Sequence, residues 1–492
     1  MTAGIWDLVA KGEQDVYINE NPDITMFKII YKRYTNFSTE IIPQRFSSNL
    51  PTFGDKVSAT ISRAGDLVKN IYLIVDLPAI SPILDNGEVS TLHKMAWSKN
   101  IGFVLIKSIE AELGGDLIDK HYGEWLYIYY ELINNKTNLN KMIGNITELT
   151  DFTNGKDAYR LYIPLQFWFN KVAGSALPLC NLQYTNFKIN LEINDLSKCL
   201  IYGPQYYIDL DIDLVHFQEG ELLVQNIDNV YSYATFFHFD ILTKRLYYNR
   251  ITNNSFIAPS LSETNLVKYY ISGNTSYFKI NPLQGKKEQI VRYPSNNPIN
   301  LKDCFLLVEY IFLDGDERTK FINSKHQYLI QQIQYSGEKV ITTTNSRIKL
   351  GFSNLCSEIL WVSQYKYFQT IRNNEFFKYN SITNNKIIKN QTLMFNGKER
   401  VSLRDSDYFD MIQIFQNHSA VPNSEINIYS LCLYPEIYQP SGSTNLSQID
   451  NVDLLINLDN NVSNKNPILL RAYAISYNIL KIENGISGLL WI

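Results

Sequence analysis

Residues 187–194 read Phe-Lys-Ile-Asn-Leu-Glu-Ile-Asn, with an apolar side chain at each odd position and a polar one at each even position. A period of two places the apolar side chains on one face of an extended chain, so the segment predicts a half-buried strand of an antiparallel sheet. The alternation recurs at 208–214, where Ile and Leu alternate with Asp, and at 472–479, where Tyr and Ile alternate with small or polar residues. We therefore predict strands in both halves of an all-β chain.

Helical patterns are scarce and local. One covers residues 123–132 and another residues 316–332, with Asp316 placed to cap the second helix. Elsewhere the segments between strands contain Gly, Asn, Asp and Ser, which favour turns. The sequence thus predicts a few short helices in the loops of a β protein.

The chain has 492 residues, well beyond the roughly 250–300 at which a single hydrophobic core stops growing. We expect at least two β domains. The division is expected between residues 214 and 230, because the acid-alternating strand ends there and a new series of strands follows.

Charge and cysteine content exclude several classes of protein. The 45 basic and 49 acidic residues give a net charge of -4, and no basic run could neutralise a nucleic-acid backbone, so direct nucleic-acid binding is not expected. Five cysteines, an odd number without CxxC spacing, indicate buried thiols in a reducing compartment. Neither a signal peptide nor a membrane-spanning stretch is evident, which predicts a protein made in the cytosol.

No pattern of catalytic residues stands out. The six histidines are dispersed, and no HExxH, P-loop, GxGxxG or GxSxG motif occurs. Asp209, Asp211 and Asp213 could attract a hard cation from one strand face, but a solvated face is the favoured interpretation. Residues 314–318, Asp-Gly-Asp-Glu-Arg, lack the ligand register of a calcium loop, and a turn with a helix cap explains them better. We predict no enzyme, no cofactor, and no catalytic or metal site.

The N-terminus carries a short apolar group, Ile5, Trp6, Leu8 and Val9. Such a segment could pack against neighbouring protein or lie on a membrane surface. Contact with protein is the favoured interpretation.

Read in order, segments along most of the chain resemble the major capsid proteins of nucleocytoplasmic large DNA viruses. Near the N-terminus the resemblance rests on Gly-Glu-Gln-Asp-Val-Tyr-Ile-Asn-Glu-Asn-Pro at 12–22, and then on residues 24–28, 34–37, 60–67, 118–125, 162–169, 176–179 and 182–184. The second half adds residues 317–318, 327–330, 358–362, 395–397, 429–430, 435, 439–442 and 445–450, and closes with Tyr-Ala-Ile-Ser-Tyr-Asn at 473–478. An ordered series of this kind is far more specific than one short motif.

The resemblance implies two consecutive eight-stranded antiparallel jelly rolls. We assign residues 1–25 to an N-terminal arm, 26–220 to the first jelly roll and 221–492 to the second. The family implies a structural protein that forms homotrimeric capsomers of pseudo-hexagonal outline, which tile an icosahedral shell. Its expected partners are neighbouring capsomers and minor capsid proteins, above an internal membrane, in a virion assembled in the host cytoplasm.

Two alternatives remain open at this point. A paralogue of the same fold could serve as a minor capsid protein, or as an assembly scaffold that is later shed. Because lectins share the jelly-roll architecture and fold alone does not fix function, a glycan-binding protein is the alternative from a different class.

Overall fold

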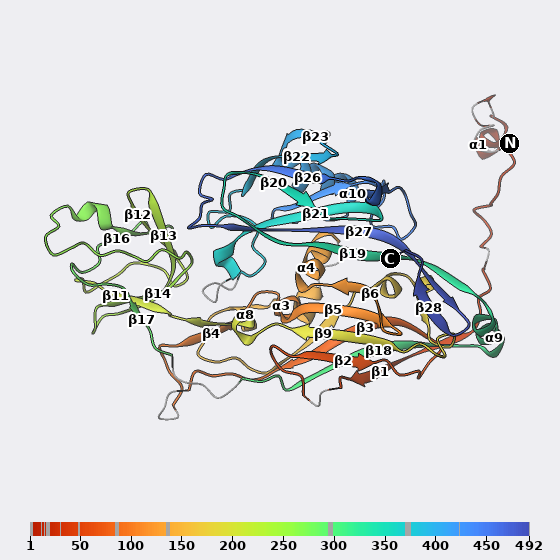
Figure 1. The fold of residues 1–492 in the computed structure, drawn as a ribbon, viewed down its shortest axis with the longest axis horizontal. Helices are drawn as coiled ribbons and strands as arrows, with labels where there is room; N and C mark the ends of the chain where they lie inside the picture. The colour runs from red at the N-terminus through yellow and green to blue at the C-terminus, as the bar shows by residue number, and fades with distance from the viewer. Residues whose placement is uncertain are drawn as a thin grey trace.

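The computed structural model describes all residues except 1–2, 11, 14, 16–19, 30, 48–49, 84–87, 134–137, 294–298, 370–374, 423 and 492. Two β-sandwiches lie one above the other in Figure 1, a smaller β domain lies beside them, and the N-terminal segment with α1 (Ala3–Val9) extends away from the body. The described part of the chain contains no helix long and apolar enough to cross a membrane.

The first sandwich has eight main strands in two antiparallel sheets, ordered β1-β18-β3-β7 and β2-β9-β5-β6. Taken along the chain as strands one to eight, the orders are 1-8-3-6 and 2-7-4-5, which is a jelly roll. The strands are β1 (Phe37–Arg45), β2 (Lys56–Thr60), β3 (Leu67–Leu77), β5 (Ile106–Leu113), β6 (Asp116–His121), β7 (Tyr159–Pro164), β9 (Phe187–Ile193) and β18 (Asp303–Leu313).

The second sandwich repeats this topology. Its sheets are ordered β19-β27-β21-β24 and β20-β26-β22-β23, again 1-8-3-6 and 2-7-4-5. The strands are β19 (His326–Ile341), β20 (Asn345–Leu350), β21 (Leu355–Tyr365), β22 (Ile388–Phe395), β23 (Lys398–Asp405), β24 (Ile426–Ser430), β26 (Val452–Leu458) and β27 (Ile468–Glu483). The fold is thus two eight-stranded jelly rolls, as the resemblance implied.

The expected division at residue 221 is wrong, because the first jelly roll is completed by a strand from far along the chain. Strand β18 pairs with β1 on one side and β3 on the other. Between β9 and β18 an insertion forms its own seven-stranded sheet and its own core. Its strands are β11 (Tyr206–Asp209), β12 (Leu222–Ile227), β13 (Val230–Asp240), β14 (Arg245–Arg250), β15 (Ile271–Gly273), β16 (Lys279–Ile280) and β17 (Gln289–Ile290). The insertion already includes β11 and the core residues Ile208 and Leu210, so the change of domain lies before residue 206 and not between 214 and 230.

The observed helices and strands agree with the ranges predicted from the sequence in some places and differ in others. Helix α4 (Gly123–Leu132) has the predicted bounds, and the alternating segment at 187–194 forms β9. The second predicted helix is shorter: α9 (Gly315–Asn323) is capped by Asp314, whose carboxylate accepts from Gly315 N, and not by Asp316. β19 then begins at His326, inside the stretch for which the sequence predicted a helix.

Short helices occupy the loops, and one additional strand pair joins the sandwich to the insertion. The helices are α3 (Ile101–Leu105), α5 (Leu139–Met142), α6 (Thr147–Thr150), α7 (Trp168–Lys171), α8 (Leu196–Cys199) and α10 (Gln413–Asn417). Strands β4 (Lys94–Trp97) and β10 (Leu200–Gly203) pair with each other, and β10 leads directly into β11.

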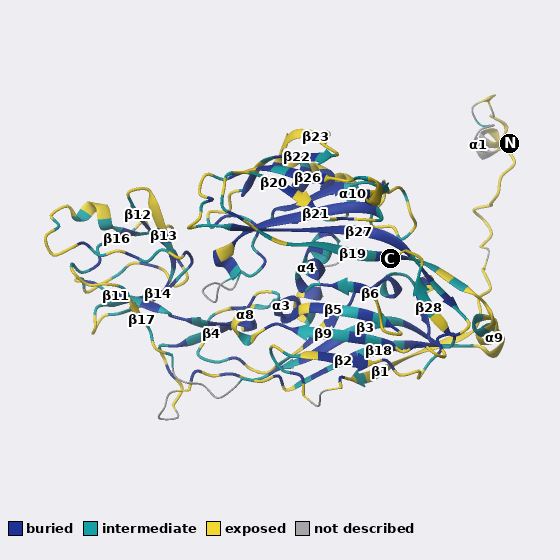
Figure 2. Ribbon diagram, viewed as in Figure 1, coloured by how far each residue is buried: buried dark blue, intermediate teal, exposed yellow. Residues whose placement is uncertain are grey.

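Strand β27 is buried on both faces, and this joins the two jelly rolls. Leu470, Ala472 and Ala474 lie in the core of the second jelly roll, whereas Tyr473 and Ile475 join the core of the first. Figure 2 shows the resulting dark, buried band through the middle of the molecule. The alternation at 472–479 predicted the strand correctly and a solvent face wrongly, because a second domain covers that face.

Helix α4 fits between the jelly rolls only because it begins with glycine. A Cβ on Gly123 would overlap the carbonyl oxygen of Phe103 and lie 2.5 Å from that of Ile106. Both obstacles are backbone atoms and cannot move aside alone. We expect Gly123→Ala to lower the free energy of unfolding by about 3 kcal/mol, the upper part of the range for overpacking.

Gly174→Ala is the matched control, because its Cβ would meet no atom within 4 Å. Chemical denaturation of both variants measures the difference. Equal stability of the two would show that the α4 backbone shifts freely.

Candidate functional site: a buried ion pair between the two jelly rolls

A buried guanidinium–carboxylate pair joins the two domains. Arg471 from β27 donates from Nε to Glu124 Oε2 and from Nη2 to Glu124 Oε1, both at 2.6 Å, and Glu124 lies in the first turn of α4. The Arg471 side chain is 6% exposed and that of Glu124 is 11% exposed. Two parallel bonds of this kind fix orientation as well as distance.

Further polar groups complete the surroundings of the pair. The hydroxyl of Tyr473 donates to Glu124 Oε2 at 2.7 Å, and that of Tyr379 donates to Oε1 at 3.0 Å. Arg471 also donates to Glu338 at 3.1 Å and to Gln364 at 2.8 Å. Burial alone would lower the pKa of Arg471, but Glu124 outweighs it and the pKa lies above its usual value. Separating the two members of such a buried pair is strongly destabilising, so the pair holds α4 and β27 in one relative position.

A second set of polar links lies at the contact between β6 and β19. Backbone N of Ile333 donates to Asp119 Oδ1 at 3.0 Å, and Asp119 Oδ2 lies 2.8 Å from His121 Nε2. Lys171 donates to Gln331 at 2.6 Å. Burial lowers the pKa of Lys171 to about 8, against the opposing effect of Asp119. The Ile333–Asp119 and Lys171–Gln331 bonds run between the two jelly rolls, whereas Asp119 and His121 both belong to β6.

A cavity of about 200 Å³ lies at the same seam, lined by residues of both domains, including Trp125, Lys171 and Glu358. His418 Nε2 lies 2.8 Å from Glu358 Oε1, and His418 Nδ1 lies 3.3 Å from Glu436 Oε1. Burial would lower the pKa of His418, but the two carboxylates raise it to about 10. The histidine is therefore a buried cation at neutral pH, held by the second jelly roll.

The carboxylates considered at the sequence level do not form a metal site. β11 ends at Asp209, which pairs with Arg245, while the exposed Asp211 and Asp213 face Lys244. Among the residues that the structure describes, no group of three or more His, Cys, Asp or Glu side chains could hold a metal ion. Asp314 serves as the helix cap described above.

The cysteines are buried for the most part, as expected, whereas the N-terminal apolar group is exposed and its contact with neighbouring protein stays a prediction. All five cysteines are free, and four of them are buried, with Cys180 half-buried. In the N-terminal segment, Ile5, Trp6, Leu8 and Val9 are exposed on this chain. Several residues of the expected 1–25 arm lie outside the described residues, and the described residues up to 36 belong to no sheet.

The sequence alone did not reveal the ion pair. Glu124 and Arg471 are separated by 347 positions, and only Arg471 is a single charge among apolar neighbours. One signal was available in the sequence: Arg471 stands between Leu470 and Ala472 in an apolar stretch of the strand. A charged group at such a position is rarely buried without a partner.

Comparison with known proteins gives consistent results over the whole chain. A family model described as the major capsid protein N-terminus matches residues 25–239, and one described as the large eukaryotic DNA virus major capsid protein matches residues 317–488. The chain is 37% identical to probable capsid protein 4 of Acanthamoeba polyphaga mimivirus and 30% identical to the major capsid protein of Pyramimonas orientalis virus, covering 99% of each chain in both cases.

Solved structures share the fold. PBCV-1 VP54 matches with a TM-score of 0.63 at 23% identity, over 95% of this chain and all of that one. The Faustovirus major capsid protein matches with a TM-score of 0.66 at 12% identity, over 96% of this chain and 94% of that one. At these identities the likeness establishes the double jelly roll.

Removing one member of the buried pair should cost far more than removing an exposed pair. We expect Arg471→Met to lower the free energy of unfolding by about 3–5 kcal/mol, because Glu124 would remain buried without a cation. The double variant with Glu124→Leu should recover part of the loss. Arg160→Met, which removes the exposed pair with Asp76, is the control and should change stability little. Denaturant titration gives the comparison, and equal losses for the two single variants would contradict it.

The His418 cluster should make stability depend on pH. The pKa of His418 is higher in the folded chain, about 10, than the ordinary value of 6.5, so the folded state binds the proton more tightly. This stabilisation is fully present below about pH 6.5 and is lost as the pH rises toward 10. We expect His418→Gln to flatten the decline of unfolding free energy between these pH values. An unchanged slope in the variant would assign the decline to other groups.

Proposed function

Because the chain belongs to the major capsid protein family of large eukaryotic DNA viruses, we propose that three copies form a capsomer of hexagonal outline that tiles the viral shell. The protein is a structural capsid protein of the virion. Its relatives are shell components, which points to a non-enzymatic role.

The observation that carries the proposal is the repeated topology. Each chain presents two jelly rolls of identical strand order, held side by side through α4 and β27. Three chains about a threefold axis place six such sandwiches in a ring, and closed rotational symmetry needs only one kind of contact between subunits. A six-sided unit can then tile a flat facet.

An apolar patch on the second jelly roll supplies a candidate subunit contact. It comprises Met411, Ile412, Phe415, Leu433, Tyr434 and Ile437, all more than 45% exposed on the single chain. Its two segments are tied together, since Ser430 N donates to Gln413 and Ser419 N donates to Glu436. Exposed apolar and aromatic groups gathered in this way are typical of protein interfaces. We assign the patch to the neighbouring copy in the trimer.

The N-terminal segment is proposed to contact other shell proteins. Trp6 is 63% exposed and Phe27 is 99% exposed, and the segment extends away from the body (Figure 1). A chain that leaves such side chains uncovered gains stability by laying them on a neighbouring capsomer or a minor capsid protein. An internal viral membrane close to the shell base is the other proposed neighbour, and assembly is proposed to take place in the host cytoplasm.

A role as minor capsid protein or transient scaffold is the second candidate within the same family. The relative at 37% identity carries the name probable capsid protein 4, and capsid protein 1 of the same virus is a separate relative at 33% identity. One virus therefore holds more than one such chain. Quantitative mass spectrometry of mature particles separates the roles, because a major shell protein dominates the particle and a scaffold is depleted from it.

The trimer is tested by the mass of the purified protein in solution. Light scattering coupled to size exclusion should give the mass of three chains, and Phe415→Asp should shift the protein to monomer because a buried charge without a partner destabilises an interface. The monomeric variant should still unfold in one cooperative transition, because Phe415 is 80% exposed on the single chain and does not belong to its core.

Leu242→Asp, at a residue 95% exposed on the insertion, is the matched control and should remain trimeric. A wild-type protein that stays monomeric would refute the trimer. A trimeric Phe415→Asp variant would place the subunit contact elsewhere.

A further inference from the structure

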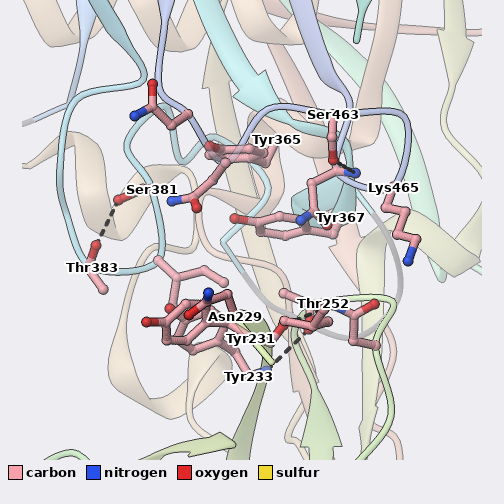
Figure 3. Close-up of a pocket in the computed structure, with 16 residues that line it drawn as sticks. Asn229, Tyr231, Tyr233, Thr252, Tyr365, Tyr367, Ser381, Thr383, Ser463 and Lys465 are labelled. Carbon is pink, nitrogen blue, oxygen red and sulfur yellow. Dashed lines mark hydrogen bonds between the residues drawn. The ribbon is translucent and has the colours of Figure 1, made fainter. Parts of the chain in front are cut away.

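A pocket of about 520 Å³ lies where the insertion meets the second jelly roll. Its lower wall in Figure 3 comes from β13 and from the turn before it, and its upper wall comes from the end of β21 and from loops around residues 381–383 and 460–466. The volume lies within the ~300–1,000 Å³ of typical small-molecule sites. The described residues that line this pocket take no part in the contacts between the jelly rolls given above.

Two pairs of stacked tyrosines face each other across the pocket (Figure 3). Tyr231 and Tyr233 stack with ring centroids 6.0 Å apart and planes 13° apart. Tyr365 and Tyr367 stack at 5.0 Å and 10°. Each pair is spaced by two positions along the chain. Burial raises the pKa of Tyr233, Tyr365 and Tyr367, so their hydroxyls remain protonated.

The lower wall is held in place by a tight hairpin. Residues Ile227 and Val230 pair across a two-residue turn, in which Asp228 and Asn229 both have positive φ. Such turns match the twist of the flanking strands and are rigid. Thr252 Oγ1 accepts from Tyr233 N at 3.2 Å, and Asn254 donates to Tyr231 O at 2.9 Å. The tyrosine platform is therefore formed before any ligand arrives.

The rest of the lining consists mainly of amides and hydroxyls. Asn229, Asn254, Ser381, Thr383, Ser463 and Asn466 contribute side chains that both donate and accept hydrogen bonds. Of the described residues that line the pocket, only Lys465 is charged. A phosphate-rich ligand would need more cations, and a lipid would need a more apolar wall.

We propose that this pocket binds a short saccharide that contains an acidic sugar unit. Sugar rings present C–H faces, which pack on aromatic rings, and hydroxyl groups, which pair with side chains that donate and accept equally. The Lys465 ammonium lies at the edge of the same space and pairs with the carboxylate of the sugar (Figure 3). This binding is independent of the shell-building role and adds a recognition function to the insertion.

The test uses labelled, full-length protein in its native oligomeric state on an array of neutral hexose, N-acetylhexosamine and uronic-acid oligosaccharides. Binding should be strongest for uronic-acid probes, and calorimetry then gives the Kd for the strongest of them. Tyr231→Ala should weaken binding about tenfold, the effect of losing one stacked aromatic contact. Lys465→Ala should weaken binding of uronic-acid probes and leave that of neutral probes unchanged.

Controls separate loss of the pocket from loss of the fold. Tyr231 is 42% exposed, so its replacement should leave the melting temperature unchanged. Tyr277→Ala, at an 81% exposed tyrosine of the same insertion outside the pocket, should bind like wild type. Thr383→Ala, at an exposed lining residue, is the second variant if Tyr231→Ala is unstable.

Absence of saccharide binding by the intact oligomer would overturn the proposal. So would wild-type binding by both Tyr231→Ala and Thr383→Ala. Equal affinity for neutral and uronic-acid probes would overturn the acidic sugar as the ligand.

Discussion

A guanidinium and a carboxylate that have both been taken out of water must stay together, and in this chain each belongs to a different jelly roll. Arg471 on β27 and Glu124 on α4 share two hydrogen bonds, and two tyrosine hydroxyls occupy the remaining acceptor sites of the carboxylate. Any sliding or rotation of one jelly roll against the other would separate the charges at a cost of several kcal/mol. The apolar contacts of Tyr473 and Ile475 supply attraction, and the ion pair selects one orientation.

A shell subunit needs that fixed orientation more than it needs stability. In the proposed trimer, two sandwiches that rotated freely would give no defined hexagonal outline, and errors would accumulate across a facet. Apolar packing between sheets tolerates small displacements, whereas a bidentate pair does not. The need for one fixed orientation explains why charged groups lie at this seam. Apolar residues of similar size would give equal or greater stability but a less exact orientation.

The sequence could predict what is local. The alternation at 187–194 identified β9, and the pattern at 123–132 identified α4 with its bounds, because period and turn chemistry are properties of neighbouring residues. It could not show that β18 returns across the insertion to lie between β1 and β3. That pairing joins segments far apart in the sequence, and no local pattern specifies which strand edges meet. The resemblance supplied the double jelly roll but not its boundary. It included Glu124, within residues 118–125, but not Arg471, and no local rule connects the two members of the ion pair.

The insertion shows how a recognition surface can be added without disturbing the shell. It leaves and re-enters the first jelly roll near β4 and β10, where the Tyr293 hydroxyl donates to Lys94 O at 3.2 Å and its ring lies 4.5 Å from that of His93. Its other contact is with the second jelly roll, through Leu222, Tyr233 and Ile251. Because both jelly rolls are already fixed by Arg471 and Glu124, the insertion rests on an immobile base. The walls of its tyrosine-lined pocket belong to two domains and therefore keep a constant spacing. A binding pocket that is divided between domains needs such a constant spacing in order to be selective.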